Sequence, residues 1–144
     1  MTTVNQLLRN KGEQVWSVSP DTSVYVALEL MAAKNIGALL VLDGAKLAGI
    51  FSERDYARKI ILHGKASKDT PVKDIMTSKV VTVRPDQTIE ACMALMTDKR
   101  IRHLPVLDGD KVIGVISIGD VVKGIIAEQE FRIEQLESYI TSTG

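Results

Sequence analysis

The sequence contains an internal repeat, so any fold it adopts must be built twice. When the chain is shifted against itself by about 65 positions, residues 15–58 match the second half without a gap. The matches include Pro20-Asp21 with Pro85-Asp86, Val41-Leu42-Asp43-Gly44 with Val106-Leu107-Asp108-Gly109, and Gly49, Ser52 and Asp55 with Gly114, Ser117 and Asp120. Chance does not produce a register of this length, so the chain is a tandem duplication.

Both copies predict the same order of secondary structure, β-α-β-β-α. Pro-Asp precedes the first helix, apolar residues recur along that helix at helical spacing, and Asp-Gly marks a hairpin turn between the last two strands. A Ser-x-x-Asp string opens the second helix of each copy. The predicted strands are 15–18, 38–42 and 47–51, then 80–83, 104–107 and 112–116; the predicted first helices are 22–35 and 87–100.

A single copy is too small to be stable, because three strands and two helices bury too little surface. We therefore expect an α/β (α+β) fold of two tandem β-α-β-β-α repeats, packed sheet to sheet about a pseudo-twofold axis with a cleft between them. The repeats divide the chain into residues 1–68, with an N-terminal segment and a polar connector, and residues 69–144. The segments that precede the two copies also match: Val4, Leu7 and Leu8 resemble Val72, Ile75 and Met76.

The end of the chain predicts a long C-terminal amphipathic helix from residue 120 to residue 140. It is longer than the matching helix of the first copy by about two turns or more. Its apolar face either packs on its own domain or uses the excess length to pack against a second subunit. The residues near that face are Val122, Ile125, Ile126, Ile133, Leu136 and Ile140.

Composition narrows the classes of function. Apolar residues make up 45% of the 144 residues and charged residues 25%, the balance of a soluble globular protein. The 18 basic and 18 acidic residues leave no net charge, which argues against binding nucleic acid or an anionic membrane. No apolar run approaches the roughly 20 residues that cross a bilayer. The single cysteine, Cys92, and the lack of a signal peptide favour a cytoplasmic location.

The duplicated unit resembles the CBS domain, and the chain is similar to a stand-alone tandem CBS pair, or Bateman module. The likeness rests on two Gly-hydrophobic-hydrophobic-Ser-x-x-Asp strings, residues 49–55 and 114–120, and on Leu104-Pro105 and the Asp-Ile-Met-Thr string at 74–77. The resemblance implies a non-catalytic sensor that binds an adenine nucleotide in the cleft and often pairs into a flat dimer. AMP is the first expected ligand, then NAD or NADH, then ATP, with no metal.

The Ser-x-x-Asp strings admit two interpretations. As a helix cap, the Ser hydroxyl accepts from the backbone of the Asp, whose carboxylate reaches back. As a ligand site, the same helix end offers N–H groups to an anion. The resemblance then implies that Asp55 and Asp120 bind ribose hydroxyls while Ser52 and Ser117 lie near phosphate. The glycine before each string is expected to let a ligand approach the backbone.

The adenine side is expected at the first strand of each copy and at the start of the second. Backbone groups there would read the adenine edge, and apolar side chains would enclose the ring. Leu40 stands where the second copy has Pro105, so the two sites are not expected to be equivalent. The expected lining is Ser17, Val18, Ile36, Gly37, Ala38 and Leu39 in the first copy and Thr82, Val83, Ile101, Arg102, His103, Leu104 and Pro105 in the second. Gly119, within the second Ser-x-x-Asp string, is also expected to bind the ligand.

A cationic cluster in the second copy is expected to face the phosphates. It consists of Arg100, Arg102 and His103, and its alternative interpretation is a solvated loop. Arg54 and Arg58 either join this cluster or pair with acidic neighbours on a helix face.

Three functions compete on these observations. The first is the nucleotide sensor, which would signal to an unidentified protein partner by conformational change, most simply as a homodimer. The second is an enzyme, which the sequence disfavours because it has no Walker loop, nucleophile elbow or usable metal-ligand cluster. The third is a dimerising scaffold whose ligand site is vestigial. No nucleic-acid or membrane partner is expected.

Overall fold

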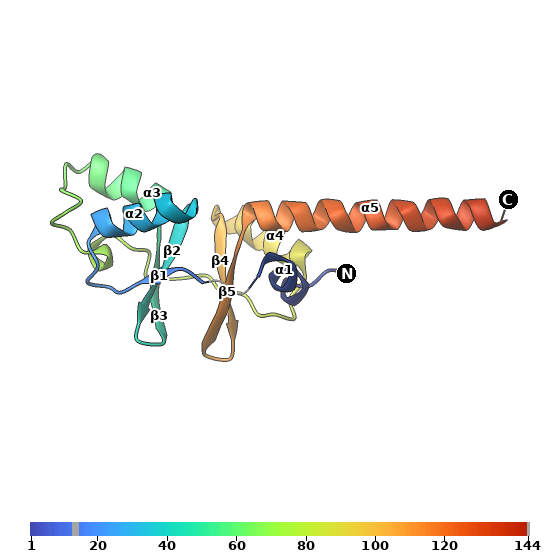
Figure 1. Cartoon of the computed structure of the whole chain (residues 1–144), viewed down its shortest axis with the longest axis horizontal. Coiled ribbons are helices and arrows are strands. Elements are labelled where there is room, and N and C mark those ends of the chain that lie inside the picture. Colours follow the sequence, from blue (N-terminus) through green and yellow to red (C-terminus); the bar gives the residue numbers. More distant parts are fainter. Residues whose placement is uncertain (13–14, 144) are drawn as a thin grey trace. The chain divides into compact units, whose positions relative to one another are not determined.

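Two compact units make up the computed structural model, which describes residues 1–12 and 15–143 (Figure 1). The first-repeat unit holds Gln14–Val81 with Gly109–Val112. The second-repeat unit holds Met1–Glu13, Thr82–Asp108 and Ile113–Gly144. Strands and helices of both repeats and one long C-terminal helix confirm the predicted α+β fold.

The first-repeat unit is a three-stranded sheet with helices before and after its hairpin. Strand β1 runs parallel to β2, and β2 runs antiparallel to β3. The predicted Asp-Gly turn is present, and Gly44 takes the positive φ of +64° that such a turn requires. The elements are β1 (Ser17–Val18), α2 (Val24–Lys34), β2 (Ala38–Asp43), β3 (Lys46–Ser52), α3 (Glu53–Asp55), the π-helical η1 (Tyr56–Ile61) and the 3-10 helix η2 (Val72–Asp74).

Local capping sets the limits of the first helix in each repeat. The Ser23 and Thr88 side chains accept hydrogen bonds from Val26 N–H and Ala91 N–H, which places the helix starts two residues after the predicted ones. At the other ends, Asn35 and Arg100 both adopt left-handed backbone conformations, with φ of 54° and 55°. Asparagine tolerates this conformation better than arginine does, so the two ends are not equally relaxed.

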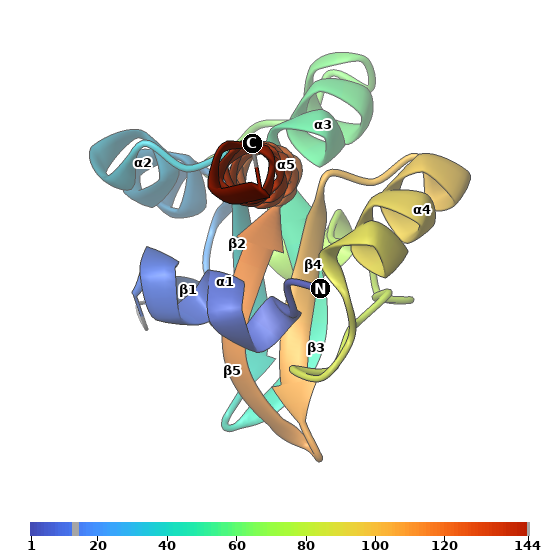
Figure 2. The same ribbon diagram turned by 90° about the vertical axis from the view of Figure 1, so that its right-hand side faces the viewer.

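The second-repeat unit has a two-stranded sheet, β4 (His103–Asp108) with β5 (Lys111–Ser117), of which the first two residues are grouped with the first-repeat unit. Its helices are α1 (Val4–Lys11), α4 (Ile89–Lys99) and α5 (Ile118–Thr143). Within this unit, α1 and α4 lie on the same side of the hairpin (Figures 1 and 2). The unit's core includes the fully buried side chains of Val4, Ile89, Cys92, Leu104, Val106, Ile116 and Val121.

The predicted strand 80–83 is wrong, because only Val83 pairs, in a parallel bridge with Val106. In the first repeat, Leu40 N–H donates to the Trp16 carbonyl at 3.3 Å and extends the pairing. The aligned residue of the second repeat is Pro105, which has no N–H to donate. The ladder therefore stops at Val83, whose N–H bonds the Pro105 carbonyl at 3.0 Å.

The segment that precedes each repeat belongs to the unit of the other repeat. Thr3 forms a bridge with Thr88, and Val4 N–H donates to the Gln87 carbonyl at 2.8 Å. The matching bonds in the first-repeat unit join Pro71 to Ser23 and Val72 N–H to the Thr22 carbonyl at 2.8 Å. The two segments thus pack in the same way, each at the start of the first helix of the other repeat, which explains their weak sequence similarity. The division of the sequence at residue 68 stays a prediction.

The glycine that opens each Gly-hydrophobic-hydrophobic-Ser-x-x-Asp string makes room for the docked segment. Its expected role in ligand approach stays a prediction. A Cβ on Gly114 would stand 2.6 Å from Leu8 Cδ2, and one on Gly49 would stand 2.6 Å from Met76 Sδ. Leu8 and Met76 are the aligned residues of the two segments. A side chain at either glycine would therefore collide with packed protein.

Candidate functional site

Both Ser-x-x-Asp strings form capping boxes at the carboxyl ends of strands β3 and β5. In the first repeat, Asp55 N–H donates to Ser52 Oγ at 3.3 Å, and Ser52 N–H donates to Asp55 Oδ2 at 3.0 Å. In the second, the equivalent bonds between Asp120 and Ser117 measure 3.1 and 2.8 Å. These bonds confirm the capping interpretation. A ligand would have to bind hydrogen-bonding groups of the two strings that the capping bonds do not use.

Backbone hydrogen bonds join each string to the start of the second strand of its repeat. Glu53 N–H donates to the Gly37 carbonyl at 3.1 Å, and Ile118 N–H donates to the Arg102 carbonyl at 2.8 Å. In the first repeat, Ala38 also pairs directly with Ser52. Within each unit the fold thus brings together two of the segments that the sequence assigned to the sugar and the base.

Asp55 is largely occupied by the protein itself. It is only 9% exposed. Its Oδ2 accepts from Ser52 N–H and Oγ, while its Oδ1 accepts from Thr77 Oγ1 at 3.2 Å and lies 3.4 Å from Lys59 Nζ. A ribose hydroxyl would have to displace at least one of these partners, which disfavours Asp55 as a ligand group.

Asp120 is more accessible and is paired differently. Its side chain is 24% exposed, against 12% for the Asp55 side chain. Its Oδ2 accepts hydrogen bonds from Ser117 N–H at 2.8 Å and from Lys11 Nζ at 2.7 Å. Lys11 comes from the docked helix α1 and also donates to the Val115 carbonyl at 2.8 Å. Sequence reasoning missed Lys11, because nothing in its own neighbourhood indicates that α1 crosses to the second repeat.

The ion pair with Lys11 controls the protonation of Asp120. Partial burial alone would raise the pKa of this carboxyl group. The hydrogen bond and charge of Lys11, together with the bonds from Ser117, outweigh burial and hold the pKa of Asp120 below its ordinary value. The carboxylate is therefore ionised at neutral pH and can accept hydrogen bonds.

Replacing Lys11 by Met should lower the free energy of unfolding by about 0.5–1 kcal/mol at about pH 7, since a partly exposed pair is screened by water. The folded pKa of Asp120 lies below the unfolded value near 4, so the pair contributes fully above about pH 4. The contribution is lost as the pH falls through the folded pKa. Urea unfolding at about pH 7 and about pH 3 measures this change. The control is Lys79→Met, because Lys79 is the exposed lysine that aligns with Lys11. If Lys11→Met lowered the free energy of unfolding by the same amount at both pH values, the effect would not be ionic.

The residues expected on the adenine side differ in exposure. Ser17 and Thr82 are exposed, while Ile36, Gly37, Ala38, Ile101 and His103 are partly buried. The side chains of Val83 and Leu104 are in the core, at 2% and 0% exposure, and the N–H of Val83 is already bonded within the sheet. If these two residues contact a base, they have to do so through backbone atoms other than the Val83 N–H.

Of the expected cationic residues, Arg102 is the one that a backbone bond holds beside the string of the second repeat. Arg102 is exposed, and its carbonyl is the acceptor for Ile118 N–H. Arg100 is exposed and ends α4, and Arg54 and Arg58 are exposed after the first string. The Arg102 backbone bond therefore fixes this loop beside Ser117 and Asp120, as a phosphate-binding role would need.

Two classes of site are not found in the part of the chain that the structure describes. Residues 1–12 and 15–143 contain no group of three or more His, Cys, Asp or Glu side chains that could hold a metal ion. Over the same residues, no helix is long and apolar enough to cross a membrane.

Sequence comparisons agree with the repeat architecture. The family model for the CBS domain matches residues 11–62 and 72–127. The chain belongs to the CBS-domain family, as a CBS domain pair, which is a regulatory module. Among curated proteins it is 43% identical to the CBS domain-containing protein CBSX3, mitochondrial, of Arabidopsis thaliana, over 96% of this chain and 72% of that one. It is 32% identical to CBS domain-containing protein YhcV of Bacillus subtilis, over 75% and 76% of the two chains.

Solved structures show the same fold. A protein with CBS domains from Burkholderia ambifaria MC40-6 has a TM-score of 0.85 and 56% identity, over 89% of this chain and 96% of that one. The CBS-domain containing protein ATU1752 from Agrobacterium tumefaciens has a TM-score of 0.82 and 40% identity, over 85% and 98%. A CBS domain pair solved with 5′-methylthioadenosine and S-adenosyl-L-methionine has a TM-score of 0.78 but only 23% identity, over 89% and 98%.

Proposed function

We propose that the protein is a non-catalytic sensor of an adenine nucleotide and that the Asp120 string of the second repeat is its principal binding site. The observation that carries this proposal is the ionised, partly exposed carboxylate of Asp120 at a helix N-terminus, beside Lys11 and Arg102. Vicinal ribose hydroxyls donate to a carboxylate, and phosphate is attracted to cations and helix N-termini. This combination fits a nucleotide better than either group alone.

The two repeats are proposed to bind unequally. Both oxygens of Asp55 already contact protein groups, whereas the bonds to Asp120 converge on one oxygen. The first repeat also has Gly37-Ala38 where the second has the cationic Arg102-His103 pair. A ligand that needs both a carboxylate and a cation therefore has the stronger site in the second repeat.

AMP is the first candidate ligand, followed by NAD or NADH and then ATP. A single phosphate needs one cationic site, which Arg102 and its neighbours can supply. Support for the adenosine part comes from the CBS domain pair that was solved with two adenosine compounds, although that protein shares only the fold with this one. We also propose a cytoplasmic homodimer that signals to a protein partner by conformational change.

Calorimetric titration with AMP, ATP, NAD, NADH and S-adenosylmethionine tests the proposal. We expect AMP to bind with a dissociation constant below about 1 mM. Asp120→Ala should weaken binding by about tenfold or more, because two charge-assisted hydrogen bonds are lost. Asp55→Ala should change affinity less, and Asp86→Ala, at a carboxylate with a 78% exposed side chain, serves as the control.

The outcomes separate the competing functions. If none of the five compounds binds below about 1 mM, the sensor proposal fails and a scaffold with a vestigial site is favoured. If binding survives Asp120→Ala at full strength in a folded protein, the site assignment is wrong. Turnover of any compound during the titration would contradict the non-catalytic assignment.

A further inference from the structure

Helix α5 continues past the other elements of its unit as a single helix (Figure 1). Val121, near its start, is 0% exposed, whereas every residue from Gln129 to Thr141 is exposed. The exposed part carries large apolar side chains, including Ile133 at 54% and Leu136 at 62% exposure. Short isolated helices are marginal in water, and most helices in proteins are stabilised by burying an apolar face. The apolar side chains of this part of α5 therefore indicate that it packs against a partner.

Most of the exposed apolar residues of α5 follow a heptad repeat, which Gln129 interrupts and from which Phe131 and Tyr139 lie apart. Successive separations of four, three, four, three and four residues connect the positions Val122, Ile126, Gln129, Ile133, Leu136 and Ile140. In heptad notation, Ile126, Ile133 and Ile140 occupy a positions, while Val122, Gln129 and Leu136 occupy d positions. β-Branched residues at a with leucine at d favour two strands in a parallel coiled coil. All three a positions fit this rule, and Leu136 fits it at d, while Gln129 places one polar residue in the seam.

Charges beside this seam select the orientation. Arg132 lies at a g position, and Glu130 and Glu137 lie at e positions. In a parallel pair, each g residue faces the e residue five positions further along the other helix, so Arg132 meets Glu137 of the partner subunit. In a fully overlapping antiparallel pair, e positions face e positions and g positions face g positions. Glu130 would then face Glu130 and Arg132 would face Arg132, which offsets the attraction of Lys123, also at an e position, for Glu137. Like charges in contact are unfavourable, which disfavours the antiparallel arrangement.

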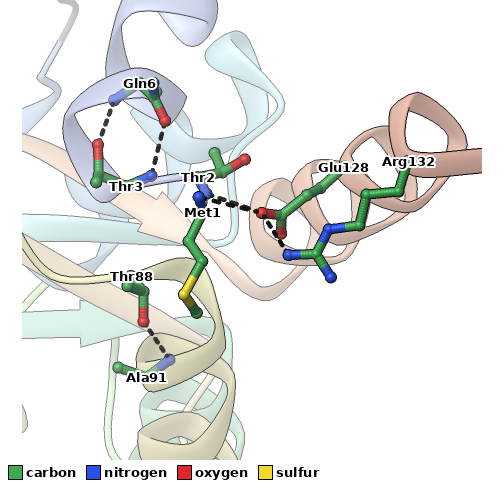
Figure 3. A network of polar contacts seen from close by, with 8 residues as sticks. All are labelled: Met1, Thr2, Thr3, Gln6, Thr88, Ala91, Glu128 and Arg132. Atoms are coloured by element: carbon green, nitrogen blue, oxygen red, sulfur yellow. Dashed lines mark hydrogen bonds and ion pairs between the residues drawn. The ribbon is translucent and has the colours of Figure 1, made fainter. Parts of the chain in front are cut away.

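The first turns of the proposed coiled coil are anchored to the unit. Glu128 accepts a hydrogen bond from Thr2 N–H at 3.0 Å and pairs with Arg132 at 3.5 Å (Figure 3). Its side chain is 10% exposed. Arg132, near the middle of the seam, is thus held along the helix by Glu128.

We propose that residues 122–140 of α5 form a parallel two-stranded coiled coil with α5 of a second copy of this chain. The seam covers less than three heptads, so its contribution to dimer affinity is modest. The inference assigns a surface to the proposed homodimer and does not depend on nucleotide binding, so each can fail without the other.

The oligomeric state of the full chain provides the first test. Light scattering after size exclusion at about 100 µM should give the mass of a dimer. Ile133→Asp and Leu136→Asp should each weaken the dimer by about tenfold or more, since each places charges in the apolar seam. Ser138→Asp adds the same charge at an f position, away from the seam, and should leave the dimer intact. A monomeric wild type, or a dimer unaffected by either seam variant, would overturn the proposal.

Disulfide trapping tests the orientation. Ile126→Cys and Ile140→Cys are made separately and oxidised. In a parallel coiled coil both positions face their own counterparts, so both variants should form a linked dimer. In any antiparallel register at most one of them can do so. The wild-type chain is the control, because Cys92 is fully buried. A linked dimer from only one variant, or from neither, would refute the parallel coiled coil.

Discussion

Gly49→Val is expected to destabilise the first-repeat unit by about 3 kcal/mol or more, a large part of the stability of a typical domain. The new Cβ would lie 2.6 Å from Met76 Sδ and 2.8 Å from the backbone oxygen of Thr77. That oxygen cannot easily move, because it accepts a 3.0 Å hydrogen bond from Ile50 N–H, and Thr77 N–H bonds back to Ile50. Urea unfolding followed by circular dichroism measures the loss.

Two other glycines provide matched comparisons. Gly114→Val should cost less, because the first atoms it meets belong to the flexible side chain of Leu8. Gly119→Ala should not be destabilising, since its Cβ would meet only Ser117 Oγ, at an ordinary 3.6 Å, within helix α5. If Gly49→Val unfolds at the same urea concentration as the wild type, the docking of the 71–77 segment against β3 is wrong.

The order of elements in each repeat could be predicted because local signals and the duplication agreed. The spacing predicted a buried stripe of Val24, Ala27, Leu28 and Met31. All but Leu28, which is only partly buried, lie in one core with residues from β2 and β3. The predicted strand 80–83 did not form because Pro105, in another segment, has no N–H to donate to it, whereas the aligned Leu40 donates to Trp16. The β-propensity of a segment does not show whether the strand beside it can supply the hydrogen bonds.

The sequence proposed residues for the candidate site but could not indicate how accessible each carboxylate would be. Nothing in the sequence separated the two carboxylates, Asp55 and Asp120, because both strings have the same spacing, although it predicted that the adenine sides of the two repeats differ. Their difference comes from Thr77 and Lys11, which reach the two carboxylates from the docked segments. Those segments are the part of the repeat whose similarity is weakest, so long-range packing, rather than local pattern, decides which carboxylate remains accessible.

The docking of α1 on the second repeat gives the other large expected effect. Leu7 and Leu8 are 7% exposed, and truncating each to Ala in a packed core costs about 2–5 kcal/mol. The double variant Leu7→Ala/Leu8→Ala should therefore remove most of the stability of the second-repeat unit. Asn10→Ala, on an exposed position of the same helix, should have little effect.

Amide hydrogen exchange read by mass spectrometry locates the loss caused by the double variant. Although α1 directly precedes the first repeat in sequence, its bonds go to Pro85, Gln87 and Thr88. Peptides covering β4 and α4 should therefore lose protection, while β2 keeps more of its protection, because opening is confined to the unit that lost its packing. If β2 loses as much protection as β4, or more, α1 does not stabilise the second repeat in the way the fold indicates.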